Sequence, residues 1–204
     1  MLLALLVPIS SALVVQVAVD GQYRPAAAMC VDAFLDMSGP FGRLKRSGAV
    51  DDWERALRSR CNSASSDNVL LTAMAEDAAD AELLGCVECG LLPPPPERRD
   101  PEAPPPPSNG ENRQQKPDVP YLANIVVAPS ARRQGVGERL VVETEKLAQS
   151  WGFGELCIKV DRSNFNARRL YDRLGYEFAY LQTSKPDWNN KQTQFLFLRK
   201  HLEQ

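Results

Sequence analysis

The alternation of apolar and polar positions divides this chain of 204 residues into short strand-like runs and longer helix-like segments. Runs rich in β-branched residues have the length and period of strands, and we predict strands at residues 13–19, 69–75, 83–92, 121–127, 155–160, 176–180 and 194–198. Apolar residues three and four apart predict helices at 26–37, 136–150 and 165–174, and a short one at 53–57 capped by Asp51 and Asp52. This pattern is typical of an α/β protein.

Two connections between these elements constrain the sheet. The helix at 136–150 joins the strands 121–127 and 155–160, and a crossover of this kind places two strands parallel. The acidic residues 76–81 join two earlier strands and are expected to form a hairpin turn. The sheet should therefore contain both parallel and antiparallel neighbours.

Composition changes sharply over residues 93–118. Most of the 16 prolines gather there, interleaved with Glu, Arg, Asn and Gln. Such a segment buries too little apolar surface to offset its ordering entropy, so we expect a disordered, proline-rich insert in a single domain at 13–201. It is either a tolerated loop insertion or a ligand for a proline-binding partner.

The N-terminal residues 1–12 are almost wholly apolar, and no Lys or Arg precedes Arg24. We interpret them as a remnant or a targeting stretch. A stable membrane span is not expected, because Pro8 and the two serines that follow interrupt the apolar run.

Charge and cysteine content exclude several classes of partner. The net charge of -2 shows no basic excess, so no nucleic acid partner is expected. Five irregularly spaced cysteines argue against a disulfide framework. Cys86 and Cys89 form a lone CxxC pair, and His201 is the single histidine, so we expect structural thiols and no metal site.

A basic, glycine-spaced turn links the strand 121–127 to the helix 136–150. Gly135 and Gly137 leave the backbone accessible, and the start of a helix offers unpaired N–H groups to an anion. The turn is not a dinucleotide-binding Rossmann turn, because Leu140 stands where the third glycine belongs. It is not a P-loop either, because Glu138 follows the last glycine.

A second motif lies about thirty residues further on and reads Asn164-x-x-Ala167-x-x-Leu170-Tyr171-x-x-x-Gly175-Tyr176. Together the turn and this motif resemble the two signatures of the GNAT superfamily of N-acetyltransferases. The segment Tyr121-Leu-Ala-Asn124-Ile-Val-Val127 is similar to sequences of the plastid-type branch of this superfamily, which acetylates protein N-termini and lysines. The resemblance implies the GNAT fold: a mixed, mostly antiparallel twisted sheet, with helices on both faces and a central parallel pair splayed at the acetyl-CoA site.

The same resemblance implies a role for each matching residue. The expected cofactor-binding residues are Ile125, Val126 and Val127 for the pantetheine arm, Arg132, Arg133, Gln134, Gly135, Val136 and Gly137 for the pyrophosphate, and Asn164 and Ala167. Tyr171 is the expected catalytic residue, facing the thioester sulfur. Without the second motif, a core aromatic on an amphipathic helix is the favoured interpretation of Tyr171, because such apolar stripes are usually packing. For Arg132 and Arg133 the alternative is a solvated basic turn.

The general base stays open. Asn124 cannot take a proton at neutral pH, so Glu82, Glu88 and a water chain are the alternatives.

The implied activity is acetyl-CoA-dependent transfer of an acetyl group to a primary amine, at protein N-termini or lysine side chains. The alternatives are a small-amine acetyltransferase, acting on polyamines or arylalkylamines, and a catalytically silent CoA-binding module. By resemblance the protein belongs in the chloroplast stroma, and otherwise in the cytoplasm.

Overall fold

The computed structural model describes residues 13–35, 42–61, 68–75, 82–94, 118–185 and 192–203. Our expectations for residues 1–12, for the turn at 76–81 and for most of the proline-rich insert lie outside these ranges. No helix among the described residues is long and apolar enough to cross a membrane.

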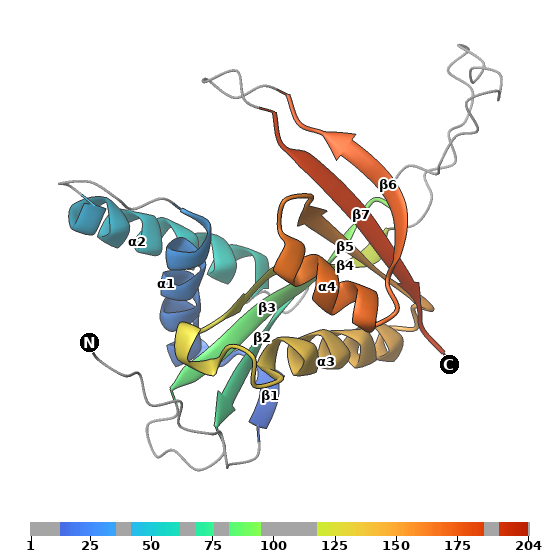
Figure 1. The fold of residues 1–204 in the computed structure, drawn as a ribbon. Coiled ribbons are helices and arrows are strands. Elements are labelled where there is room, and N and C mark those ends of the chain that lie inside the picture. Colours follow the sequence, from blue (N-terminus) through green and yellow to red (C-terminus); the bar gives the residue numbers. More distant parts are fainter. Residues whose placement is uncertain are drawn as a thin grey trace. The chain divides into compact units, whose positions relative to one another are not determined.

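The elements follow one another in the alternating order that the sequence predicts (Figure 1). In chain order they are β1 (Leu13–Val17), the short 3-10 helix η1 (Asp20–Gln22), α1 (Tyr23–Phe34), α2 (Gly42–Cys61), β2 (Asn68–Ala75), β3 (Leu83–Leu92), β4 (Val119–Val127), η2 (Pro129–Ala131), α3 (Val136–Ser150), β5 (Glu155–Asp161), α4 (Phe165–Arg173), β6 (Glu177–Thr183) and β7 (Gln194–His201). All the predicted strands are confirmed, with bounds that differ by a few residues.

The described strands form one mixed sheet in the order β1-β2-β3-β4-β5-β7-β6. The pairs β1–β2, β2–β3, β5–β7 and β6–β7 are antiparallel, and β4 and β5 form the parallel pair expected from their crossover helix. The predicted fold class is therefore confirmed.

The prediction for α2 was wrong in length. The helix spans Gly42–Cys61, so Asp51 and Asp52 lie in its middle and do not cap it. Arg24 of α1 donates to Asp51 at 2.8 Å and to Glu54 at 3.0 Å, which ties the two helices together. The many charges along α2 conceal its apolar face, and such a helix is stabilised by packing on its neighbours more than by its own pattern.

The chain folds as two compact units. Unit 1 consists of residues 1–90 and 122–147, and unit 2 of residues 91–121 and 148–204. In unit 1, helices cover both faces of the strands. Cys86 packs in a buried cluster with Val31 of α1 and Leu57 of α2. Its neighbour Gly85 faces the other way, since successive strand residues alternate, and a Cβ there would lie 3.0 Å from Leu140 of α3.

Unit 2 contains β5, α4, β6 and β7, with β7 paired to both other strands. The first residues of β4 belong to it: Val119, Tyr121 and Cys157 are buried together, and the Tyr121 ring meets Phe197 edge-on at 6.3 Å. The five cysteines of the chain are free thiols, and four of them are buried.

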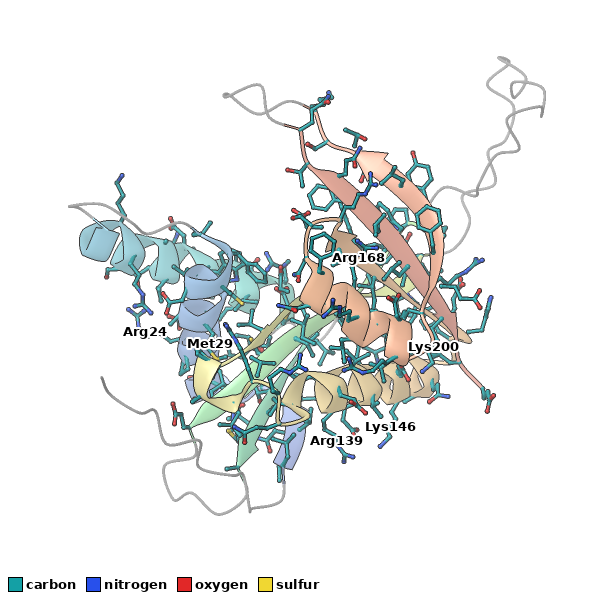
Figure 2. All side chains as sticks on the ribbon, viewed as in Figure 1. Arg24, Met29, Arg139, Lys146, Arg168 and Lys200 are labelled. Atoms are coloured by element: carbon teal, nitrogen blue, oxygen red, sulfur yellow. The ribbon has the colours of Figure 1, made fainter. Side chains whose placement is uncertain are left out.

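Charged side chains cover the outer surfaces of both units. Figure 2 shows Arg139 and Lys146 on the same side of α3, where both pair with Glu143, at 3.1 Å and 2.9 Å. In unit 2, the Lys200 ammonium lies 5.7 Å from the centre of the Tyr176 ring.

Candidate functional site

Within the strand β4, the backbone departs from extended geometry at Asn124, immediately before the three residues expected to bind pantetheine. Asn124 has φ 50°, a left-handed conformation that asparagine tolerates better than most residues. Its side-chain Nδ2 donates to Oε1 of Glu88 on β3 at 2.5 Å. The side chain is thus held by the neighbouring strand, and the left-handed conformation of Asn124 changes the direction of the backbone before Ile125.

Glu88 is buried, with 7% of its surface exposed, and it bridges three elements of unit 1. Nε and Nη2 of Arg60 on α2 donate to its carboxylate at 3.0 to 3.2 Å, and Asn124 of β4 donates from the other side. Both oxygens of Glu88 therefore have structural partners. Glu82, the other carboxylate considered as a base, is exposed at the start of β3.

Sequence reasoning did not find this Arg60–Glu88–Asn124 network. Its members lie 28 and 36 residues from one another along the chain. The only signal was a charged residue inside the otherwise apolar run of β3, because a carboxylate in such a place needs a partner.

The loop after β4 adopts a conformation suited to an anion. Arg133 has φ 63° and Gly135 has φ 82°, so left-handed residues alternate with others just before α3. Such alternation turns successive N–H groups toward one concave side, a nest for anions. A Cβ on Gly135 would meet no other atom, so a steric clash does not explain the glycine. Its positive φ does, because other residues rarely adopt that conformation.

Helix α3 begins directly after this turn. Val136 is buried with 1% exposure and anchors the first turn, and the N–H of Arg139 donates to the carbonyl of Gly135 at 2.9 Å. The N–H groups that precede Arg139 in α3 have no acceptor within the helix, as at any helix start. Together with the helix dipole they favour a bound anion next to the nest.

Two side chains of the loop hold the loop itself. Nε of Arg132 donates to the Val127 carbonyl at 3.1 Å, and Nε2 of Gln134 donates to the Ser130 carbonyl at 2.8 Å. Both arginines are exposed, and because Arg132 is hydrogen-bonded to the loop, Arg133 is the more available cation of the pair. Val126 is buried in the core of unit 1, so its contribution to a ligand would come from the backbone.

Asn164, in unit 2, is the N-cap of α4. Its Oδ1 accepts a hydrogen bond from the Ala167 N–H at 3.1 Å, which explains the spacing of these two residues in the motif. The side chain is exposed, and its Nδ2 group remains a donor for another acceptor. Capping and ligand binding can therefore use different ends of the same amide.

Tyr171 lies on α4 with only 2% of its surface exposed. Its ring meets Tyr176 edge-on, with centroids 5.8 Å apart. Burial raises the pKa of the Tyr171 hydroxyl well above its ordinary value of 10. At neutral pH the group is protonated and is a hydrogen-bond donor.

Gly175 holds the end of α4 in place. Its φ of 81° is the left-handed conformation that glycine commonly adopts just after a helix, and the Tyr176 N–H donates back to the Tyr171 carbonyl at 3.0 Å.

The structure thus brings the expected site residues together in two sets. Unit 1 holds Ile125 to Val127 and the loop from Arg132 to Gly137, and unit 2 holds Asn164, Ala167 and Tyr171. Among the described residues no group of His, Cys, Asp and Glu could hold a metal ion. The nest and helix start of unit 1 fit a diphosphate, since they combine convergent N–H groups with arginine.

Comparison with known proteins identifies the class. The sequence model described as "Acetyltransferase (GNAT) family" matches residues 41–176, so the chain belongs to the GNAT family of acetyltransferases. This family uses acetyl-CoA.

Three curated relatives share part of the sequence. GCN5-related N-acetyltransferases 4 and 7, chloroplastic, of Arabidopsis thaliana are 33% and 34% identical over 67 and 68 residues, 33% of this chain. Aminoglycoside N(6')-acetyltransferase type 1 of Serratia marcescens is 36% identical over 58 residues, 28% of this chain. The matches span 23%, 24% and 40% of these relatives' own lengths.

Solved structures share the fold at low identity. Arabidopsis thaliana NAA60, in complex with a bisubstrate analogue, superposes with a TM-score of 0.61 and 15% identity, covering 94% of this chain and 99% of that one. The ribosomal-protein-S18-alanine N-acetyltransferase of Escherichia coli has the same TM-score and 14% identity, covering 95% and 96%. These likenesses support the fold of the described residues.

Proposed function

We propose that this protein is an acetyl-CoA-dependent N-acetyltransferase that moves an acetyl group to a primary amine. The observation that carries the proposal is the nest at Arg133 and Gly135, continued by the start of α3, inside a GNAT family sequence.

Each set of residues has a part in this proposal. The N–H groups of the loop from Arg133 to Gly137 bind the pyrophosphate, and Arg133 adds its cation. The backbone of Ile125 to Val127 binds the pantetheine arm, with Val127 sharing its carbonyl with Arg132. Asn164 donates to the same arm through Nδ2, while Oδ1 continues to cap α4 at Ala167.

Tyr171 stabilises the leaving group. An attacking amine has a pKa near ~10.4 and must first lose a proton, and the departing thiol, with a pKa near ~8.5, leaves as a thiolate. Because the raised pKa makes Tyr171 a weaker acid than that thiol, complete proton transfer from it is unfavourable. Its contribution is a hydrogen bond to the charge that develops on sulfur, from a fixed position on α4.

Protein amines are the proposed acceptors, and the plastid is the proposed location. Support comes from the two chloroplastic relatives and from the fold shared with two protein N-acetyltransferases. A small-amine acetyltransferase is the second candidate, favoured by the aminoglycoside-acetylating relative.

The test is thiol release from acetyl-CoA with the full chain, offering a mixed peptide pool and a small-amine pool separately. Release that depends on the peptide pool is expected. Binding of acetyl-CoA without release from either pool would instead identify a silent CoA-binding module.

A further inference from the structure

A cavity of about 530 Å³ lies within unit 1, beside the strand expected to bind pantetheine. Its lining residues come from α2, the end of α1 and β4: Leu35, Ala49, Asp52, Trp53, Ala56, Arg60 and Asn124. The volume falls within the range of small-molecule sites, about 300–1,000 Å³. None of the residues assigned above to acetyl-CoA lines it.

The position of Asn124 connects this cavity to the reaction. Asn124 lines the cavity and directly precedes Ile125, where the proposed pantetheine-binding backbone begins. A molecule in the cavity would therefore lie next to the strand that carries the acetyl donor. The acceptor amine must approach this same strand, because the amine attacks the thioester directly.

The walls of the cavity are mainly apolar, and one of them carries a buried N–H group that has no partner among the described residues. Leu35, Ala49 and Ala56 contribute aliphatic surface, and the Trp53 ring is stacked on Phe34 with centroids 6.0 Å apart. The indole Nε1 of Trp53 is buried and has no hydrogen-bond partner among the described residues. A buried N–H without a partner costs free energy, and a hydrogen bond to a ligand carbonyl would remove that cost.

The charged groups of the cavity are already neutralised. Arg60 is paired with Glu88 at 3.0 Å. Asp52 is paired with Arg55 at 3.0 Å, and each of these two side chains is 76% exposed. The apolar part of the cavity thus provides no buried carboxylate for a second ammonium group. A polyamine that placed this group among the apolar walls would bury a charge without a partner, which is unfavourable.

We propose that this cavity binds the side chain of the first residue at a protein N-terminus, an inference that rests on the proposed function. This side chain is large, uncharged and apolar, such as that of Met or Leu. An α-amine carries its side chain on the adjacent carbon, so a pocket beside the reacting strand can receive it. The side-chain amine of lysine ends an unbranched chain, so the carbon next to it carries no side chain that could enter the cavity. A carbonyl of the bound peptide accepts the hydrogen bond from Trp53.

Peptides that differ only in the first residue test the assignment. Thiol release by the full chain should give a kcat/KM about 10- to 100-fold higher for Met or Leu than for Gly or Asp at this position, the gain expected for burying such a side chain. An N-terminally blocked peptide with an internal lysine and a polyamine should both react more slowly than the Met peptide.

Two variants distinguish the cavity from a general effect on folding. Ala56→Leu fills the cavity and should lower kcat/KM for the Met peptide about tenfold or more, while the value for the Gly peptide changes less than about threefold. Ser59→Leu adds the same bulk at an exposed position of the same helix and should change neither. Trp53→Phe should lower kcat/KM for all peptides by about 3- to 10-fold, with unchanged acetyl-CoA affinity by calorimetry.

Each outcome is decisive. Equal rates with Met and Gly peptides, preference for the polyamine, or equal losses with both peptides in Ala56→Leu would overturn the cavity assignment and leave acetyl transfer intact. An absence of thiol release with every amine would overturn the proposed function, and the assignment with it.

Discussion

Tyr171 combines two properties at a single residue: it is almost fully buried, and its pKa is raised by that burial. Tyr171→Phe keeps the ring and its contact with Tyr176 but removes the donor. We expect kcat to fall by roughly 10- to 1000-fold with little change in acetyl-CoA affinity, measured by steady-state kinetics and calorimetry. Unchanged turnover would mean that Tyr171 is a packing residue.

Arg133 can be tested without disturbing the loop, because asparagine tolerates its left-handed φ. Arg133→Asn should weaken CoA binding by about 5- to 100-fold, since a charge-assisted contact to phosphate is lost. Pantetheine, which has no phosphate, should bind equally well. Arg139→Ala removes an arginine paired with Glu143 and serves as the control. Equal losses for CoA and pantetheine would contradict a phosphate contact.

At the scale of an element, the start of α4 shows how one residue can have two uses. Asn164→Ala removes the cap on Ala167 and should lower the free energy of unfolding by about 0.5–2 kcal/mol. Asn164→Asp keeps a capping oxygen but removes the Nδ2 donor. Thermal unfolding and calorimetry together should find that Asn164→Asp is stable and binds acetyl-CoA weakly. Normal affinity in this variant would limit Asn164 to a capping role.

The close packing of β3 against α3 and β4 requires a residue without a side chain at position 85, which is Gly85. A Cβ there would lie 2.9 Å from the Val126 carbonyl oxygen and 3.0 Å from Leu140. Gly85→Ala should therefore cost about 1–3 kcal/mol in chemical denaturation, because the packing cannot expand freely. Gly154→Ala, at a site with open space, is the matched control and should change stability little. Similar stability in both variants would show that β3 and α3 can separate at this point.

For the whole molecule, buried thiols and phenols predict a loss of stability at alkaline pH. Burial raises the pKa of Cys89 and Cys157 to about 12 and that of Tyr121 and Tyr171 above the ordinary tyrosine value. The unfolded chain releases these protons first, near ~8.5 for thiols and ~10 for tyrosines, so their contribution is complete below those values and declines as pH rises toward the folded pKa values.

Denaturant unfolding between pH 7 and 11 measures this decline. These groups should make the free energy of unfolding vary little with pH up to about pH 8 and should make it fall above about pH 9. Tyr171→Phe should show a shallower fall, because one titrating group is missing. A stability that stays constant to pH 11 would contradict the burial of these side chains.

Local pattern was sufficient wherever a feature depends on consecutive residues. Short stretches of sequence encode the strand periods, the crossover helix, the left-handed Gly175 and the turn before α3. The full length of α2 was not predicted, because Arg, Lys and Asp obscure its apolar face, which only packing against its neighbours reveals.

What the sequence by itself determined is therefore the order of elements, the glycine-spaced turn before α3 and the motif of α4, since each is a property of neighbouring residues. Only the tertiary structure decided how Glu88 is used and where the cavity lies. Arg60, Glu88 and Asn124 belong to three separate elements, and no periodicity links them. Because a cavity is the space left between packed elements, its shape and its unpaired Trp53 N–H exist only once α2, β3 and β4 have come together.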